Sequence, residues 1–135
     1  MSRKTARENV YKLIFEYLFN KEKDSFSYLT IKENPNVSEE DLTFINSLYL
    51  GAVEHFDEII EKISANAKGF SLDRIYKPDL AALVLAVYEM CYTDIPKSVA
   101  ISEVLDIVKA YSTEKSSGYV NGILASVYKE LNGEQ

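Results

Sequence analysis

Apolar residues recur at three- and four-residue intervals through nearly the whole chain, and the two-residue alternation typical of strands is almost absent. Between residues 4 and 20 they fall on one face of a helix: Ala6, Val10, Leu13, Ile14, Tyr17 and Leu18. The same spacing returns in most later segments. We therefore expect an all-α fold in which amphipathic helices bury their apolar faces against one another.

Caps, prolines and polar stretches divide this pattern into elements. We expect a turn at residues 72–75, a last helix capped by Ser112 or Thr113, and helices over residues 4–20, 26–32, 38–63, 79–92 and 96–111. The helix that begins at Ser38 is expected to be the longest, and Pro78 suits a first helical turn because proline lacks an N–H group. The helix at residues 79–92 is apolar nearly all round, so we expect it at the centre. The 135 residues fit a single domain, 1–135, formed as a compact bundle of six or seven helices.

The chain lacks the residue sets that most enzymes and metal sites need. Its one cysteine, Cys91, and its one histidine, His55, fall within apolar helical patterns, so we expect neither a zinc site nor a nucleophile and base pair. Its five glycines form no phosphate-binding loop and no nucleophile elbow. We therefore expect no enzymatic activity, no metal and no cofactor.

Nothing in the sequence predicts contact with a membrane. The longest uncharged apolar run, residues 80–88, is too short to cross a bilayer. No apolar stretch of the signal-peptide type follows the charged first residues. We therefore expect a cytoplasmic protein.

The junction between the last two expected helices, residues 111–122, concentrates aromatic and polar side chains that a core does not need. On a helical wheel, Lys115 and Tyr119 lie opposite the apolar stripe of the last helix, and Tyr111 ends the helix before it. Exposed aromatic rings stack on unpaired bases, while lysines such as Lys109 and the free N–H groups of a helix start suit phosphates. This pattern predicts a nucleic-acid surface. The alternative is that both tyrosines fold onto the bundle.

The first twelve residues form a second candidate surface, because they carry four basic side chains against one acidic one: Arg3, Lys4, Arg7 and Lys12 against Glu8. The net charge of the whole chain is −6, so any RNA contact must be local and sensitive to salt. The alternative is an ordinary solvated helix end, and Arg7 falls near the edge of the apolar face.

A third candidate surface is apolar and suits a protein partner. Tyr11, Phe15 and Phe19 form a second stripe on the first helix, and a monomer rarely leaves such a row exposed. On the helix at residues 79–92, small residues flanked by acids occupy the weakly apolar face: Asp79, Ala82, Ala86 and Glu89. We expect both faces to receive a basic protein. The alternative is that residues 26–31 cover Phe15 and Phe19.

Several motifs, in order along the chain, resemble the NusB family. The segment VAISEVLDIVKAYSTEKSSGYVNGIL at residues 99–124 resembles its C-terminal signature. Further matching residues are Thr5-Ala6-Arg7-Glu8, Gly51, His55, Ala86-Val87-Tyr88-Glu89 and Ile95-Pro96. The resemblance implies an all-helical, non-enzymatic antitermination factor that binds boxA RNA of ribosomal operon leaders together with NusE, a ribosomal small-subunit protein. It also implies that this complex acts on elongating RNA polymerase with other Nus factors.

The resemblance implies roles for individual residues as well. The NusE surface of the family corresponds to Phe15 and to Asp79 with its neighbours. The RNA surface corresponds to Arg3, Lys4, Arg7, Tyr111, Lys115, Ser116, Tyr119 and Asn121. Lys115 stands at a position that is often acidic in the family, and we hypothesise that it strengthens RNA binding by removing repulsion.

Three kinds of function therefore stay open. The first is an RNA-binding adaptor that holds a single strand on the two tyrosines while a second face recruits a basic protein. The second is a protein scaffold or homodimer without an RNA role, which pairs through Tyr11, Phe15 and Phe19. The third is an enzyme fragment, because domains resembling NusB also precede some ribosomal RNA methyltransferases. No cofactor-binding segment is present up to Gln135, which favours the free-standing factor.

Overall fold

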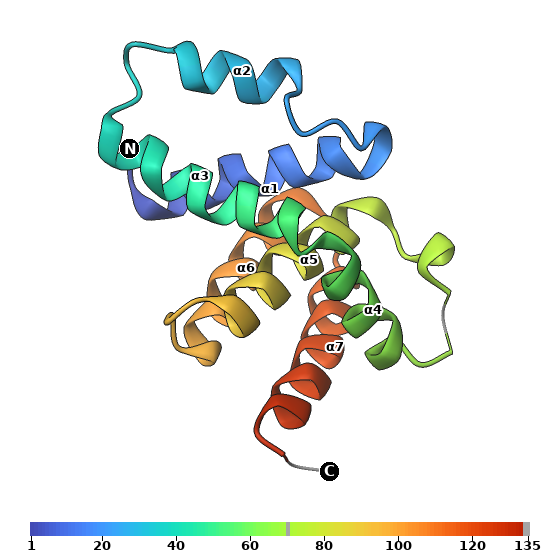
Figure 1. Ribbon diagram of the computed structural model, residues 1–135. Helices are drawn as coiled ribbons and strands as arrows, with labels where there is room; N and C mark the ends of the chain where they lie inside the picture. Colours follow the sequence, from blue (N-terminus) through green and yellow to red (C-terminus); the bar gives the residue numbers. More distant parts are fainter. Residues whose placement is uncertain (70, 134–135) are drawn as a thin grey trace.

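The computed structural model describes residues 1–69 and 71–133. These residues form seven α-helices and one short 3-10 helix, η1, and no strand (Figure 1). In chain order the elements are α1 Arg3–Asn20, α2 Phe26–Glu33, α3 Glu39–Glu54, α4 Phe56–Asn66, η1 Leu72–Arg74, α5 Lys77–Tyr92, α6 Lys97–Tyr111 and α7 Ser116–Leu131. The predicted all-α fold is confirmed.

Helix α5 forms the centre of the bundle because its side chains are apolar on almost every side. Every residue from 80 to 90 is buried, and the helix contacts α1, α3, α4, α6 and α7. Figure 1 shows α1 and α3 across one side of α5, with α2 beyond them, and α6 and α7 on the other side. Pro78 lies in the first turn of α5, as its missing N–H group predicts.

Serine side chains begin the first three helices. Ser2, Ser25 and Ser38 each accept a hydrogen bond from the backbone N–H three residues further on, at 3.0, 3.2 and 3.1 Å. Each bond satisfies an N–H group that has no partner inside its helix, so these residues stabilise the helix starts. The cap predicted at Ser38 is confirmed.

The single long helix expected at residues 38–63 is two helices, because the chain turns at His55. Helix α3 ends at Glu54 and α4 begins at Phe56. The His55 ring stacks on Tyr92 at the end of α5, with the ring centroids 4.0 Å apart. The turn allows α4 to pack against both α5 and α7. Apolar spacing continues on both sides of His55, so periodicity does not reveal the turn.

Helix α2 does not cover the aromatic stripe of α1. Its Tyr28 is buried, and the Tyr28 hydroxyl donates a hydrogen bond to Asn46 of α3 at 2.7 Å. Phe19 remains 62% exposed, and Phe15 is half-buried. The alternative in which residues 26–31 cover these two rings is therefore wrong.

A buried ion pair joins α1 to α5. Arg7 Nε donates to Glu89 Oε1 at 3.0 Å, and the Glu89 side chain is fully buried. Burial raises the pKa of Glu89, while the Arg7 guanidinium opposes this shift by stabilising the ionised carboxylate. Because this pairing draws Arg7 into the core, the prediction that Arg7 contacts RNA is wrong.

The partner surface predicted on the weakly apolar face of α5 is buried inside the bundle. Asp79, Ala82, Ala86 and Glu89 are each at most 4% exposed. The neighbouring helices pack on this face, since the small side chains of Ala82 and Ala86 allow a close approach. The prediction that these four residues receive a protein partner is therefore wrong.

The contact between α3 and α5 can be tested at Gly51. A Cβ atom at Gly51 would lie 2.0 Å from Tyr88 Oη, and the Tyr88 ring is held beside His55 and Tyr92. Gly51→Ala should therefore lower the free energy of unfolding by about 1–3 kcal/mol, measured by urea denaturation. Gly122→Ala in α7 is the matched control, because a Cβ there meets no atom within 4 Å and alanine favours a helix. Equal losses in both variants would show that the Tyr88 ring does not restrict the space at Gly51.

Removal of Arg7 alone would leave the Glu89 carboxylate buried without its counter-ion. Arg7→Ala should therefore lower the free energy of unfolding by about 3–5 kcal/mol near neutral pH. The loss should shrink in acid, because a raised pKa makes the folded protein take up a proton more readily than the unfolded chain. Proton uptake by Glu89 therefore stabilises the folded variant. This stabilisation is complete below about pH 4, where the glutamates of the unfolded chain are also protonated, and it disappears as the pH rises through the raised pKa of Glu89.

Urea denaturation at several pH values measures this loss. The double substitution of Arg7→Met with Glu89→Leu should recover most of the stability, because it leaves no buried charge. A loss that does not change with pH, or a double variant as unstable as Arg7→Ala, would show that the ion pair does not control stability here.

Candidate nucleic-acid interface

One buried carboxylate connects the junction of α6 and α7 to the start of α5. Asp79 Oδ1 accepts a hydrogen bond from Ser112 Oγ at 2.6 Å, and Asp79 Oδ2 accepts one from Ser116 Oγ at 3.0 Å. Asp79 and Ser116 are both buried. Hydrogen bonds to an ionised acceptor are stronger than neutral ones, so these two bonds hold the end of α6 and the start of α7 against α5.

The same cluster explains why the last helix does not begin at its predicted cap. Helix α6 ends at Tyr111, and α7 begins at Ser116 after an N-cap, Lys115, whose side chain forms no capping hydrogen bond. The hydroxyls of Ser112 and Thr113 lie within hydrogen-bond distance of Ser116 Oγ instead, at 2.9 and 2.8 Å. The prediction that Ser112 or Thr113 caps the last helix is therefore wrong. The prediction that Ser116 contacts RNA is also wrong, since its side chain serves this buried cluster.

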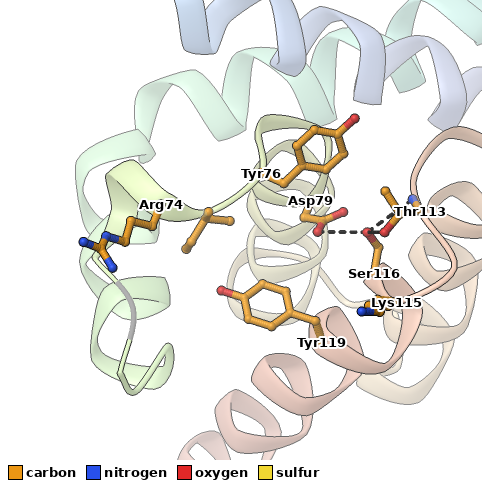
Figure 2. Close-up of a pocket in the computed structure, with 8 residues that line it drawn as sticks. Arg74, Tyr76, Asp79, Thr113, Lys115, Ser116 and Tyr119 are labelled. Atoms are coloured by element: carbon orange, nitrogen blue, oxygen red, sulfur yellow. Dashed lines mark hydrogen bonds between the residues drawn. The ribbon is translucent and has the colours of Figure 1, made fainter.

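A pocket of about 340 Å³ opens beside the cluster (Figure 2), and we call it the Tyr76–Tyr119 pocket. Its walls come from the segment before α5, the start of α5 and the start of α7: Arg74, Ile75, Tyr76, Asp79, Thr113, Lys115, Ser116 and Tyr119. Tyr119 is half-buried, and burial, followed by the charge of Asp79, raises the pKa of its hydroxyl. Its ring therefore lines a pocket, and the prediction that this ring projects freely into solvent is wrong.

Tyr111 lies in a second pocket, of about 190 Å³, which we call the Tyr11–Tyr111 pocket. The two rings that name it are 5.7 Å apart, and Lys12 Nζ lies 5.1 Å from the centre of the Tyr111 ring. Phe15 and Pro78 complete the lining. Tyr111 is 42% exposed, so the predicted exposure of this ring is confirmed. The two junction tyrosines thus line two different pockets at the start of α5.

Tyr11 is buried, so the aromatic stripe that α1 exposes is shorter than predicted. The Tyr11 hydroxyl donates to the Pro78 carbonyl at 3.1 Å. Burial, with a smaller effect from Asp79, raises the pKa of Tyr11 to about 12. The predicted exposure of Tyr11 is wrong, because its hydroxyl joins α1 to α5. Phe15 and Phe19 remain accessible and contact each other edge to face, with centroids 5.0 Å apart.

The predicted cations differ in how much they interact with the rest of the bundle. Arg3 pairs with Glu40 at 3.5 Å, and its guanidinium lies 4.1 Å from the centre of the Phe44 ring. Six predicted RNA-binding residues are exposed: Arg3, Lys4, Lys109, Tyr111, Lys115 and Asn121. Within the two described ranges, none of these three lysines forms an ion pair. They are the cations best placed to meet phosphates.

Sequence reasoning missed two exposed side chains of the Tyr76–Tyr119 pocket. Arg74 ends η1, and Tyr76 directly precedes α5. The signal that could have found them was an arginine and a tyrosine in the short segment before Pro78. Such a segment is exposed by its position, so an aromatic side chain there is not needed for the core.

The part of the chain that the structure describes contains no group of three or more side chains arranged to hold a metal ion. None of its helices is long and apolar enough to span a bilayer.

Known proteins resemble this chain over nearly its whole length. The model of the NusB family matches residues 4–129. The transcription antitermination protein NusB of Finegoldia magna is 39% identical over 130 residues, which cover 96% of this chain and 95% of that protein.

Solved structures agree with this match. T. maritima NusB superimposes with a TM-score of 0.84 at 31% identity, over 96% of this chain and 92% of that one. A chain from a crystal structure of antitermination factors NusB and NusE in complex with dsRNA gives a TM-score of 0.83 at 25% identity, over 95% and 96% of the two chains. Because sequence and fold agree over almost all residues, the chain belongs to the NusB family.

Proposed function

We propose that this chain is a transcription antitermination factor that binds boxA RNA of ribosomal operon leaders together with NusE, a ribosomal small-subunit protein. Its membership of the NusB family carries this proposal, supported by its similarity to a structure of NusB and NusE with RNA. The complex would act in the cytoplasm, with RNA polymerase and other Nus factors, to promote processive transcription. The role is binding and not catalysis, and residues 1–135 act as one domain.

We assign the RNA contact to the junction of α6 and α7 and to the first turn of α1. These regions expose cations and aromatic rings, the two kinds of group that bind a single strand through its phosphates and bases. The surface consists of Arg3, Lys4, Lys109, Tyr111, Lys115, Tyr119 and Asn121. Since the chain is acidic overall, the affinity must come from this local set.

We assign the NusE contact to the exposed end of the α1 stripe. Phe19 is the most exposed member, and Phe15 lies between it and the Tyr11–Tyr111 pocket. An acidic chain also suits a basic partner. Because Phe19 is so exposed, a homodimer through the same stripe is the second candidate. Sedimentation of the chain alone distinguishes the two, since only a homodimer gives a dimer that Phe19→Ser converts to a monomer.

Titration of the protein with a boxA-type RNA and with a shuffled RNA tests the proposed function. We expect the boxA-type RNA to bind more tightly, and purified NusE to increase the affinity further by adding its own contacts. Fluorescence anisotropy measures both effects. Equal binding of the two RNAs, with and without NusE, would refute the specific adaptor.

Lys115 provides a test of the RNA surface by charge. Lys115→Glu should weaken RNA binding. It should also reduce the slope of the logarithm of the binding constant against the logarithm of the salt concentration by about one, the amount expected for the loss of one phosphate contact. Lys129→Glu is the matched control, because it makes the same change in charge at an exposed position near the other end of α7. Unchanged affinity and salt dependence in Lys115→Glu, or equal effects in both variants, would remove Lys115 from the interface.

A further inference from the structure

Tyr76 is an exposed aromatic side chain on the wall of the Tyr76–Tyr119 pocket. It directly precedes α5, and 54% of its surface is accessible to solvent. A tyrosine this exposed adds little to the core, but its flat apolar ring is available to a ligand. Figure 2 shows Tyr76 and Tyr119 on either side of Asp79, and both side chains line the same pocket.

Two cations flank this space. Arg74 lies on the side of η1, and Lys115 lies at the start of α7 (Figure 2). Both are exposed, and neither forms an ion pair within residues 1–69 and 71–133. Asp73, next to Arg74 in the sequence, lines a different pocket together with Lys21 and Lys77. The pocket therefore offers positive charge on a chain whose net charge is −6.

The Asp79 carboxylate and the hydroxyls beside it are already bonded to one another. Asp79 accepts hydrogen bonds from Ser112 and Ser116, and the Thr113 hydroxyl lies 2.8 Å from that of Ser116. These groups are therefore not available to recognise the edge of a base, whereas the charges of Arg74 and Lys115 are available to phosphates. The fitting ligand has a flat face for the ring wall and a negative charge for the two cations, which is the chemistry of a nucleotide.

We propose that the Tyr76–Tyr119 pocket holds one unpaired nucleotide of the bound RNA, with its base against the Tyr76 ring and the neighbouring phosphates at Arg74 and Lys115. This inference rests on the proposed function and adds a binding position to it. A volume of about 340 Å³ is at the small end of ligand pockets, which suits one nucleotide and excludes a duplex. Because stacking does not depend on the base edge, this pocket adds affinity without selecting a base.

Variants of Tyr76 test the stacking. Tyr76→Ala should weaken binding of a boxA-type RNA at least about fivefold, and Tyr76→Phe should bind as the wild type does because the ring remains. Tyr128→Ala removes another exposed tyrosine, near the end of α7, and should leave the affinity unchanged. Thermal melts of all three variants confirm that a loss of binding is not a loss of fold.

RNAs with a single abasic site at each position in turn locate the nucleotide. At one position, the missing base should weaken wild-type binding at least about fivefold but should not weaken Tyr76→Ala any further. Exchange of that base for another should change the affinity less than about threefold, because a stacked base is not read at its edge.

Three results overturn the inference while the proposed function stands. The first is that Tyr76→Ala binds the RNA as tightly as the wild type does. The second is that an abasic site at every RNA position weakens Tyr76→Ala as much as it weakens the wild type. The third is that Tyr76→Ala binds NusE more weakly in the absence of RNA, which would assign the pocket to a protein. Failure of the wild type to prefer the boxA-type RNA over the shuffled one would instead overturn both.

Discussion

The buried carboxylate of Asp79 determines where both candidate pockets lie. An anion in the core is costly unless hydrogen bonds replace its water. Asp79 meets this condition as the third residue of α5, near the positive end of the helix, where the Ser112 and Ser116 hydroxyls both donate to it. The last turn of α6 and the first turn of α7 must therefore meet α5 at this point. Lys115 and Tyr119 owe their positions to this constraint.

Two consecutive residues at the start of α5 connect different parts of the molecule. The Pro78 carbonyl accepts a hydrogen bond from the Tyr11 hydroxyl of α1. The Asp79 carboxylate accepts hydrogen bonds from the Ser112 and Ser116 hydroxyls at the junction between α6 and α7. One pocket forms where α1 meets Pro78, and the other forms where α7 meets Asp79. Both pockets are therefore built on the same turn of one buried helix.

The helices were predictable from the sequence because each buries one apolar face, and α5 was recognisable as central because it has no polar face. The turn at His55 was not predictable, since it depends on stacking with Tyr92, which lies 37 positions away in the chain. Burial of Glu89 was missed for a similar reason. A helical wheel places a carboxylate on the outside, whereas a single arginine from another helix is enough to hold it inside.

For the candidate site, the sequence located the junction between α6 and α7 along the chain, but it did not reveal how the side chains of the junction are arranged. Tyr111 and Tyr119 are eight positions apart on either side of a turn, and only the positions of α1 and α5 decide which pocket each ring enters. Tyr76 and Arg74 were missed because nothing in their local pattern connects them with residues 111–122, although the fold places them opposite that segment.

The distribution of charge over the surface decides where RNA binding is favoured. Both arginines of α1 pair with carboxylates, Arg3 with Glu40 at the surface and Arg7 with Glu89 in the core. Helices α3 and α4 expose further acids without an equal number of cations: Glu39, Glu54, Asp57, Glu58 and Glu61. The acidic faces of α3 and α4 repel a polyanion, whereas Lys4, Arg74 and Lys115 form no ion pair within the described part of the chain. Under the proposed function, a strand of RNA would therefore be steered to the unpaired cations of an acidic protein, and added salt should weaken that steering.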